Sequence, residues 1–263
     1  ITSVNTGSGT WTLDRNCTTG AGSAMVGRMG GCLDTPAAAA AVPVAGNTIW
    51  IKDNAAALGA TVTFAVVGTN AAKIKISGYT TTHGDADLAT ITSSTNSVDL
   101  FTFNNADFYV VRWFNFTHTA GTRGNGIVSV TNASTNVEIA DCVFDGCLSA
   151  IVSGTSGAQL TCNISDCEIK NCTSTDGAII LSSNMTIYMT ECDVHDNTGA
   201  GIYSSVAAGW FLNLDHCIFD TNSYHISIAN QIGTLLATHC TFYNATNDSI
   251  QVVHALSASE RMV

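Results

Sequence analysis

Five segments between residues 137 and 243 repeat one another: VEIADCVFD (137–145), CNISDCEIK (162–170), IYMTECDVH (187–195), LNLDHCIFD (212–220) and LLATHCTFY (235–243). Their central cysteines are spaced by 25 residues, and by 23 at the last step. Self-similarity at a fixed period of this size is typical of a solenoid, in which each repeat packs on its neighbours. The cysteines of this column are Cys142, Cys167, Cys192, Cys217 and Cys240.

Apolar and polar residues alternate within each repeat, as in a β-strand with one buried face. The alternation slips by one residue beside Asp141, so we expect the chain to turn a corner there. A further apolar position predicts a third strand and a roughly triangular turn, here called a rung. The predicted inward columns are Val137, Cys162, Ile187, Leu212 and Leu235; the five cysteines with Phe144, Ile169, Val194, Phe219 and Phe242; and Ile127, Ile151, Ile179, Ile202, Ile226 and Ile250.

Earlier rungs are less regular but follow the same pattern, in FYVVRWFNF (108–116) and AKIKISGYTT (72–81). The sequence therefore predicts an all-β, right-handed parallel β-helix over residues 46–254, with about eight rungs of ~25 residues. Asparagine tolerates left-handed backbone and bonds to its own main chain, which predicts a turn lined by asparagines. Its members are Asn171, Asn197, Asn222 and Asn244.

We expect residues 1–45 to form an N-terminal segment with a short helix that covers the open end of the solenoid. Thr35 followed by Pro36 suits a helix start, and the alanine run 37–41 can continue the helix until Pro43. The first strand of the solenoid is predicted at 48–51, and residues 255–263 form a C-terminal tail. The tail offers no comparable plug, so we expect a partner or additional residues to cover that end.

The composition excludes several classes of partner. Hydrophobic residues make up 46% of the chain and charged residues 11%, with a net charge of −11. The imbalance lies after residue 136, where 2 Lys/Arg face 13 Asp/Glu and 2 − 13 = −11. Such a surface repels phosphate backbones and anionic lipid, so we expect no nucleic-acid and no membrane partner.

The segments GNTIWIKDNAAAL (46–58) and KIKISGYTTTHGD (73–85), followed by the rungs, resemble the pectin-lyase-like superfamily of right-handed β-helices. More narrowly, they look like β-helix proteins found among bacteriophage structural and tail-associated proteins and bacterial surface proteins. The resemblance covers residues 46–254 in architecture. Its motifs belong to the scaffold, so what it implies is the fold more than an activity.

The cysteines are interpreted as a buried ladder of free thiols that act as small hydrophobic side chains, since the CxxC spacing of zinc sites is absent. Two further pairs leave disulfides open. Cys147 and Cys172 are again 25 residues apart and fall on neighbouring rungs, and Cys17 and Cys32 lie in the N-terminal segment. We expect no metal and no cofactor.

Asp141, Asp166 and Glu191 precede the ladder cysteine on three successive rungs. Stacked acids can raise a pKa or hold Ca²⁺, and they are the catalytic candidates if the chain is an enzyme. The resemblance implies lyases that bind calcium with acids and abstract a proton with a basic residue. Lys170 is the one basic residue of these rungs, so the arginine of such lyases has no counterpart.

Glycoside hydrolysis needs two carboxylates roughly 5–10 Å apart in a cleft. Asp145 with Asp166, or Asp193 with Asp220, could meet this requirement across adjacent rungs. The alternative is that these acids are solvated groups at a corner. The histidines at 195, 216 and 239 are expected to point outward on the rung faces.

We favour a non-enzymatic structural or surface-exposed virion protein, such as a decoration, fibre or spike component, with possible glycan recognition. This predicts a virion or extracellular location and a homo-oligomer or larger assembly. The alternatives are a polysaccharide lyase or glycoside hydrolase of the pectin-lyase-like type, and a bacterial adhesin or filament subunit. Aromatic side chains that could stack on sugar rings in a glycan-binding protein are Trp113, Trp210 and Tyr243.

Overall fold

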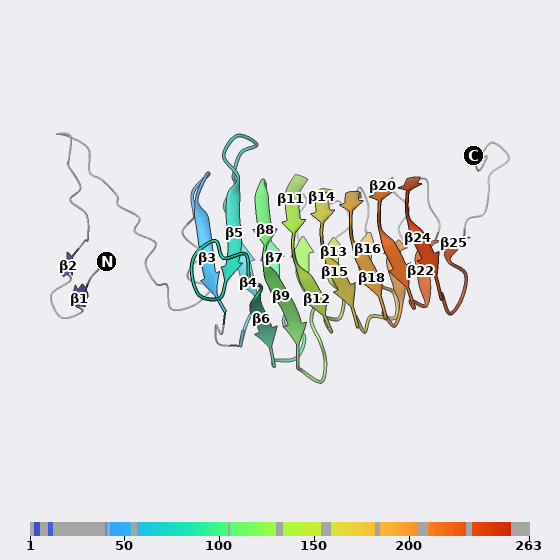
Figure 1. The fold of residues 1–263 in the computed structure, drawn as a ribbon, viewed down its shortest axis with the longest axis horizontal. Coiled ribbons are helices and arrows are strands. Elements are labelled where there is room, and N and C mark those ends of the chain that lie inside the picture. The colour runs from blue at the N-terminus through green and yellow to red at the C-terminus, as the bar shows by residue number, and fades with distance from the viewer. Residues whose placement is uncertain are drawn as a thin grey trace. The chain divides into compact units, whose positions relative to one another are not determined.

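A computed structural model describes residues 3–5, 10–12, 40, 43–53, 57–104, 106–129, 134–153, 159–181, 185–204, 210–229 and 233–253. The chain divides into two compact units, residues 1–31 and 32–263. In the first unit, β1 (Ser3–Asn5) and β2 (Thr10–Thr12) form an antiparallel pair. The second unit holds all the remaining strands and is a parallel solenoid (Figure 1).

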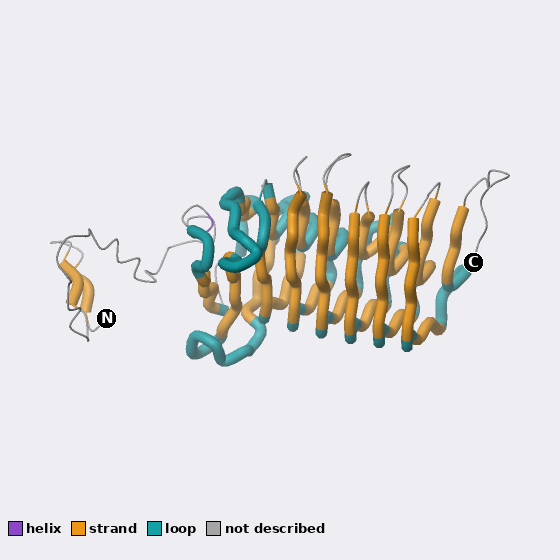
Figure 2. The backbone as a smooth tube through the Cα atoms, turned by 90° about the horizontal axis from the view of Figure 1, so that it is seen from above, coloured by secondary structure: helices purple, strands orange, loops and turns teal. Residues whose placement is uncertain are grey.

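The solenoid consists of three parallel sheets, and consecutive strands of one rung belong to different sheets (Figures 1 and 2). Sheet I contains β3 (Thr48–Lys52), β5 (Ile74–Tyr79), β8 (Tyr109–Arg112), β11 (Ser134–Ala140), β14 (Gln159–Ser165), β17 (Met185–Thr190), β20 (Trp210–Asp215) and β23 (Gly233–Thr238). Sheet II contains β6 (Ala89–Ser93), β9 (Phe114–His118), β12 (Val143–Asp145), β15 (Glu168–Lys170), β18 (Asp193–His195), β21 (Ile218–Asp220) and β24 (Thr241–Tyr243). Sheet III contains β4 (Val62–Phe64), β7 (Phe101–Phe103), β10 (Ile127–Ser129), β13 (Ile151–Ser153), β16 (Gly177–Leu181), β19 (Ala200–Ser204), β22 (Tyr224–Ala229) and β25 (Ile250–Val253).

With eight, seven and eight strands, the sheets make about seven complete turns of a right-handed parallel β-helix. The predicted fold class is therefore confirmed, with slightly fewer turns than the eight expected. The predicted first strand is confirmed as β3. Of the predicted capping helix, the structure describes Ala40 alone, which has helical backbone and is buried; the rest of that prediction and the tail 255–263 lie outside the described residues.

The strand register confirms the three predicted inward columns. In sheet I, Val137 pairs with Cys162, Cys162 with Ile187, and Ile187 with Leu212. Sheet II aligns its buried phenylalanines and aliphatic residues in the same way, and sheet III aligns its isoleucines. Because each rung pairs its backbone N–H and C=O groups with the rungs on both sides, apolar side chains of one column stack inside the solenoid.

Two corners of the rung are made by single residues with left-handed backbone. At the first corner, between sheets I and II, φ is +52° to +62°; at the second corner, after sheet II, it is +51° to +74°. The predicted corner beside Asp141 is thus confirmed. The left-handed residues are Trp113, Asp141, Asp166, Glu191, His216 and His239 at the first corner, and Gly146, Asn171, Asp196, Thr221 and Asn244 at the second.

The predicted asparagine-lined turn consists of two neighbouring columns. Asn171 and Asn244 are the left-handed, exposed residues, as expected. Asn197 and Asn222 lie one position later and are buried, with exposed fractions of 4% and 0%. The four asparagines therefore lie at or near one corner, as predicted, but at two adjacent positions of the rung, one with an exposed side chain and one with a buried side chain.

The last rung, β23 to β25, is more exposed than the rungs before it. Leu212, Phe219 and Ile226 are fully buried, whereas Leu235 and Phe242 of the next rung are only partly buried. Ile250, which is in register with Ile226, is 43% exposed. The inward side chains of this rung are therefore more exposed to solvent than those of the rungs before it.

Candidate functional sites

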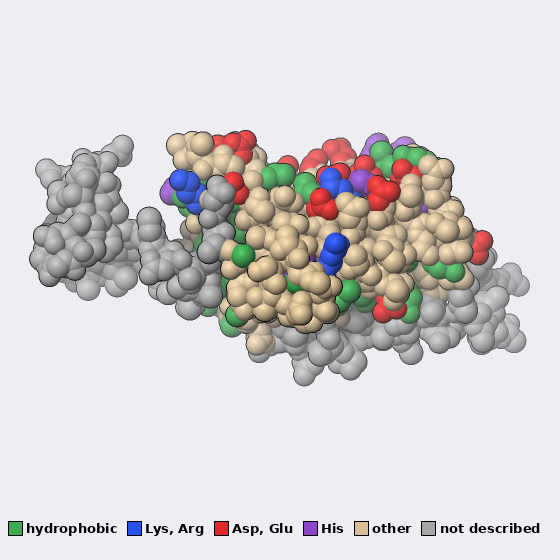
Figure 3. Space-filling model, turned by 90° about the horizontal axis from the view of Figure 1, so that it is seen from below, with side chains coloured by type: hydrophobic (Ala, Val, Ile, Leu, Met, Phe, Trp, Pro, Cys, Tyr) green, Lys and Arg blue, Asp and Glu red, His purple; other side chains and the backbone are tan. Residues whose placement is uncertain are grey.

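Charged side chains gather along part of the solenoid surface, beside a broad area of uncharged polar groups (Figure 3). A compact group lies on the outward face of β15 and β18, and we call Glu168, Lys170, Asp193, His195 and Asp196 the His195 cluster. Glu168 Oε1 accepts hydrogen bonds from Lys170 Nζ at 2.8 Å and interacts with His195 Nε2 at 3.1 Å. His195 Nδ1 lies 2.7 Å from Asp196 Oδ2. The imidazole therefore connects carboxylates from two rungs.

The cluster separates the pKa values of two neighbouring carboxyl groups. Burial raises the pKa of Asp193, and the charge of Glu168 adds to this increase. Burial also acts to raise the pKa of Glu168, but the hydrogen bonds from Lys170 and His195 outweigh it and lower the pKa. Asp193 Oδ1 is buried without a hydrogen-bond partner among the described residues. Pairs of acids with divergent pKa values are typical of acid–base catalysis.

The carboxylate pairs proposed for glycoside hydrolysis are arranged differently from expectation. Asp193 pairs in register with Glu168 on one side and Ile218 on the other, so Asp220 lies diagonal to it and opposite His195. Asp145 is opposite Lys170 and accepts a hydrogen bond from the corner residue Asn171. Glu168, which the sequence argument left out, is the direct neighbour of Asp193.

The predicted catalytic acids Asp141, Asp166 and Glu191 occupy the left-handed position of the first corner on successive rungs, and all three are exposed. Their backbone N–H groups bond to carbonyls of the next rung, which aligns the three residues along the solenoid. The three residues thus follow one another along the first corner, at the positions that the repeat predicted. Its role in catalysis or calcium binding stays a prediction.

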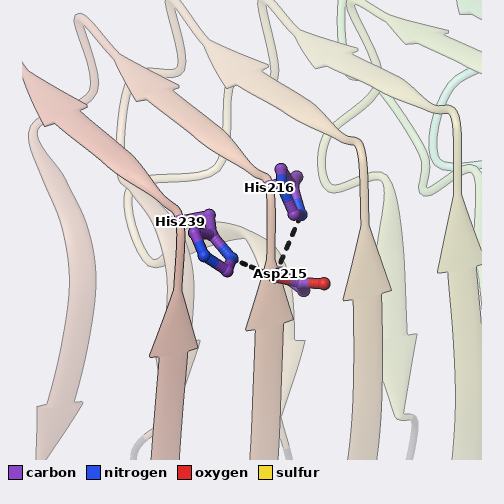
Figure 4. Close-up of side chains that lie close together, drawn as sticks. All are labelled: Asp215, His216 and His239. Carbon is purple, nitrogen blue, oxygen red and sulfur yellow. Dashed lines mark hydrogen bonds and ion pairs between the residues drawn. The ribbon is translucent and has the colours of Figure 1, made fainter.

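The same column continues with two histidines, and the preceding residue supplies a carboxylate (Figure 4). Asp215 Oδ1 lies 3.0 Å from His216 Nδ1 and 3.2 Å from His239 Nδ1. The two imidazole rings stack with centroids 4.5 Å apart. Hydrogen bonds from Thr238 and His239, with that from His216, lower the pKa of Asp215 to about 2. As predicted, both histidines point outward, with side chains 55% and 71% exposed.

An aromatic stack lies on the outer side of the first rungs. Trp50 stacks on His83 with ring centroids 5.2 Å apart and on Trp113 with centroids 6.3 Å apart. The guanidinium of Arg112 lies 4.4 Å from the centre of the Trp113 ring, and Tyr79 meets His83 edge-on. Trp50 and Trp113 are half-buried, while His83 is exposed. We call these five residues the aromatic stack.

The GYTTTHGD segment positions His83 in this stack. Asp85 accepts hydrogen bonds from the backbone N–H groups of Thr80, Thr81 and Thr82, which closes a tight loop. Burial acts to raise the pKa of Asp85, but the N–H donors together hold it well below its usual value. The carboxylate therefore stays charged and holds the loop.

The other aromatic candidates differ from one another. Trp113 belongs to the aromatic stack, as described. Trp210 is only 8% exposed and lies within the hydrophobic core, so it cannot stack on a sugar at the surface. Tyr243 is 44% exposed on the last rung and remains an exposed aromatic side chain.

The second corner borders two open hollows on either side of Arg123. One, of about 450 Å³, is lined by Thr117, Asp145, Asn171 and Asp196 among others. The other, of about 690 Å³, is lined by Asp99, Asn125 and Leu148 among others. Arg123 Nη1 donates to the backbone oxygen of Asn171, so its charge is held beside the acids of this corner.

The ladder cysteines are free thiols, as predicted, and Cys142, Cys167, Cys192 and Cys217 are buried while Cys240 is partly exposed. Cys147 and Cys172 are also free and buried, so the disulfide considered for them is absent. Burial raises the pKa of Cys172 to about 12, which keeps this thiol protonated and unreactive. Cys17 and Cys32 lie outside the described residues.

Residues 149–259 match a family model described as the right handed β-helix region, so the chain is similar to that family over this stretch. No curated protein and no solved structure gives a significant match. The class that the fold defines is therefore the right-handed parallel β-helix. Among the described residues, no helix is long and apolar enough to cross a membrane.

Proposed function

We propose that the chain is a non-enzymatic structural subunit, displayed on a virion or a comparable extracellular particle, that assembles through its last rung. The observation that carries this proposal is the exposure of the solenoid interior at β23 to β25. Leu235, Cys240 and Phe242 are only partly covered there, although the residues in register with them one rung earlier are fully buried.

An open rung is a template for another chain. Among the described residues, β23, β24 and β25 are edge strands of the three sheets, and edge strands offer backbone donors and acceptors to a further chain, here beside an apolar interior. A subunit that adds its own strands to this edge would bury both at once, as in β-strand addition. Leu236, at 47% exposure, and Ile250 extend the apolar surface around the same rung. We propose a second copy of the chain as the occupant in the assembled particle.

The mass of the protein in solution tests the assembly. We expect a mass above that of one chain at micromolar concentration in light scattering, and a return to one chain in the variant Leu236→Lys with Ile250→Lys, because edge charges block strand pairing. Tyr188→Lys is the matched control, since Tyr188 is 41% exposed but lies on an inner strand of sheet I. A single-chain mass for the folded native protein at these concentrations would contradict the proposal.

The particle itself is tested by imaging native material. Cryo-electron microscopy of particles purified from the source should show the β-helix as a repeated subunit in a capsid, tail or filament lattice. Isolated single molecules in that material would count against a structural role and favour an enzyme.

We also propose that such a subunit contacts a glycan through the aromatic stack. Half-buried indole rings offer rigid apolar area to the C–H face of a sugar, and Arg112 adds hydrogen-bond donors beside them. Binding to a panel of neutral polysaccharides should be lost in Trp50→Ala and retained in Tyr188→Ala. Equal binding by both variants would remove the aromatic stack as the glycan site.

A second candidate function is glycoside hydrolysis at the His195 cluster. Asp193 and Glu168 are register partners on adjacent strands, and glycosidases use two carboxyl groups that lie close together. Asp193, whose pKa burial raises, would be the acid, and Glu168, whose pKa the hydrogen bonds from Lys170 and His195 lower, would be the nucleophile. If this is the activity, Asp193→Asn and Glu168→Gln abolish glycan cleavage, whereas Asp176→Asn, an exposed acid elsewhere, does not.

A further inference from the structure

We propose that Asp215, His216 and His239 form a binding site for a divalent transition-metal ion of the zinc, nickel or copper type. The proposal is independent of the proposed assembly and glycan contact. It rests on one carboxylate and two imidazoles whose candidate ligand atoms all lie within 4.8 Å of one another.

The β-helix backbone brings the two histidines together. His216 and His239 occupy the same left-handed corner position on adjacent rungs, with φ of +52° and +53°. Equal backbone geometry directs their side chains the same way, and the rings stack at an angle of 24°. The site therefore needs no large movement of the main chain to place both imidazoles on one ion.

The carboxylate lies between the two rings. Asp215 precedes His216 and pairs in register with Thr238, the residue before His239. Asp215 Oδ1 accepts a hydrogen bond from Thr238 Oγ1 at 2.8 Å and is within 3.2 Å of both imidazole Nδ1 atoms (Figure 4). Thr238 thus orients the carboxylate in the way that outer groups orient metal ligands. A metal ion would take the place of the two imidazole protons that now face this oxygen.

The ligand set selects the type of ion. Imidazole nitrogen suits zinc, copper, nickel and iron, whereas calcium and magnesium prefer sites made of oxygen alone. Three protein ligands leave at least one position for water or a fourth ligand. Both histidines are more than half exposed, so the ion can enter and leave from solvent. The acidic C-terminal half raises the local concentration of cations around the site.

Neighbouring groups give the controls. Cys240 follows His239, but its Sγ is directed to the carbonyl oxygen of Thr238 at 3.2 Å and belongs to the inward column. His195 points outward from sheet II and is bonded to two carboxylates of its own cluster. Cys240→Ser therefore changes the thiol next to a proposed ligand, and His195→Gln changes an imidazole of another cluster, and neither removes a ligand of the site.

The test is a titration of the metal-free full chain with Zn²⁺ and Ni²⁺ by isothermal titration calorimetry. We expect one ion per chain with the native protein. Mutating a residue that only orients a metal ligand typically weakens metal binding by about 10–100-fold. Loss of a ligand itself should cost at least as much, so we expect His216→Asn, His239→Asn and Asp215→Asn each to weaken binding by at least about tenfold. Cys240→Ser and His195→Gln should bind like the native chain, and Ca²⁺ should not compete.

A second measurement identifies the ligands directly. Substoichiometric Cu²⁺ should broaden the imidazole NMR signals of His216 and His239 before those of His83 and His195. Native-like affinity in the double variant His216→Asn with His239→Asn would overturn the proposal. So would loss of binding in Cys240→Ser, or broadening that begins at His195.

Discussion

The corner between sheets I and II and the corner after sheet II both contain a residue with left-handed backbone, but the buried side chain that follows this residue differs between the two corners. At both corners, a left-handed residue is followed by a residue of the inward column. At the first corner this inward residue is Phe114 after Trp113, and from Asp141 onward it is the ladder cysteine. At the second corner it is cysteine at 147 and 172, and then asparagine at 197 and 222.

The two kinds of inward residue need different surroundings. Each ladder thiol directs its Sγ to the carbonyl oxygen two residues before it, for example Cys192 to Thr190 at 3.3 Å. The Sγ atoms of Cys142, Cys167 and Cys192 also lie 3.7–3.9 Å from a carbonyl oxygen of the previous rung. The buried amides form a hydrogen-bonded ladder instead. Asn197 Nδ2 donates to Asn222 Oδ1 at 2.9 Å, and Asn222 Nδ2 donates to Val194 O at 2.8 Å. A buried thiol tolerates apolar neighbours, whereas a buried amide is stable only with its partners present.

The largest effect is expected from breaking the amide ladder. Asn222→Ala removes the acceptor of the Asn197 backbone and side-chain N–H groups and the donor to Val194 O. Three buried groups lose a partner, and each such loss costs about 1–3 kcal/mol, so we expect a loss of at least about 3 kcal/mol in the free energy of unfolding. Urea denaturation followed by circular dichroism measures it. Cys172→Ala, two rungs earlier in the same column, is the control and should cost about 1 kcal/mol; equal losses would show that the amides only fill space.

The next effect tests whether the ladder thiols act as apolar groups. Cys192 is 2% exposed, and serine would place a hydroxyl in its apolar surroundings. We expect Cys192→Ser to cost about 1–3 kcal/mol, and Cys192→Ala to cost about 1 kcal/mol for the lost volume. The same denaturation experiment compares the two. If serine proves milder than alanine, the hydrogen bond to Thr190, and not apolar burial, would explain the column.

A smaller effect concerns the left-handed residues themselves. Glu191 adopts φ of +53°, which is unfavourable for most side chains and better tolerated by asparagine. We expect Glu191→Asn to stabilise the protein by up to about 1 kcal/mol. The reverse exchange at the second corner, Asn171→Glu, should destabilise it by a similar amount. The midpoints of thermal unfolding measure both, and shifts of the same sign would refute a shared backbone cause.

The smallest effect is the pH dependence linked to His195. Burial lowers its pKa, but the hydrogen bonds that His195 donates to Asp196 and Glu168 outweigh burial and raise the pKa above the usual 6.5. This stabilisation is therefore complete below about pH 6.5 and is lost as the pH rises through the higher folded-state pKa. For a solvent-screened pair we expect about 0.2–1 kcal/mol. His195→Gln should flatten the stability curve over this range, and an unchanged slope would assign it to another group.

The repeat predicted most of the fold because stacking enforces it. Any residue that repeats every rung has the same surroundings above and below, so the inward columns, the corner beside Asp141 and the start of the first strand followed from spacing alone. The asparagine turn was only partly right. Asn171 and Asn197 differ by one residue in their position on the rung, and that single step decides whether an amide is solvated or buried.

The candidate sites were less predictable. The positions of Asp141, Asp166 and Glu191 followed from the repeat, but the partnership of Asp193 with Glu168 depends on the register of β15 and β18. The Asp215–His216–His239 group was missed as a site, although its signal was present. Two histidines that fall in one column on adjacent rungs must stack, and the aspartate before the first of them lies within reach of both.

The sequence by itself determined the solenoid, its inward columns and the acidity of its C-terminal half, because these depend only on periodicity and composition. The tertiary structure alone decided which outward groups meet. The aromatic stack joins Trp50, His83 and Trp113, which are distant in sequence. Such contacts depend on register, loop shape and rotamer. These vary from rung to rung, so the contacts produce no repeating pattern in the sequence. The exposure of the last rung is also a tertiary result, because burial depends on what lies above each residue.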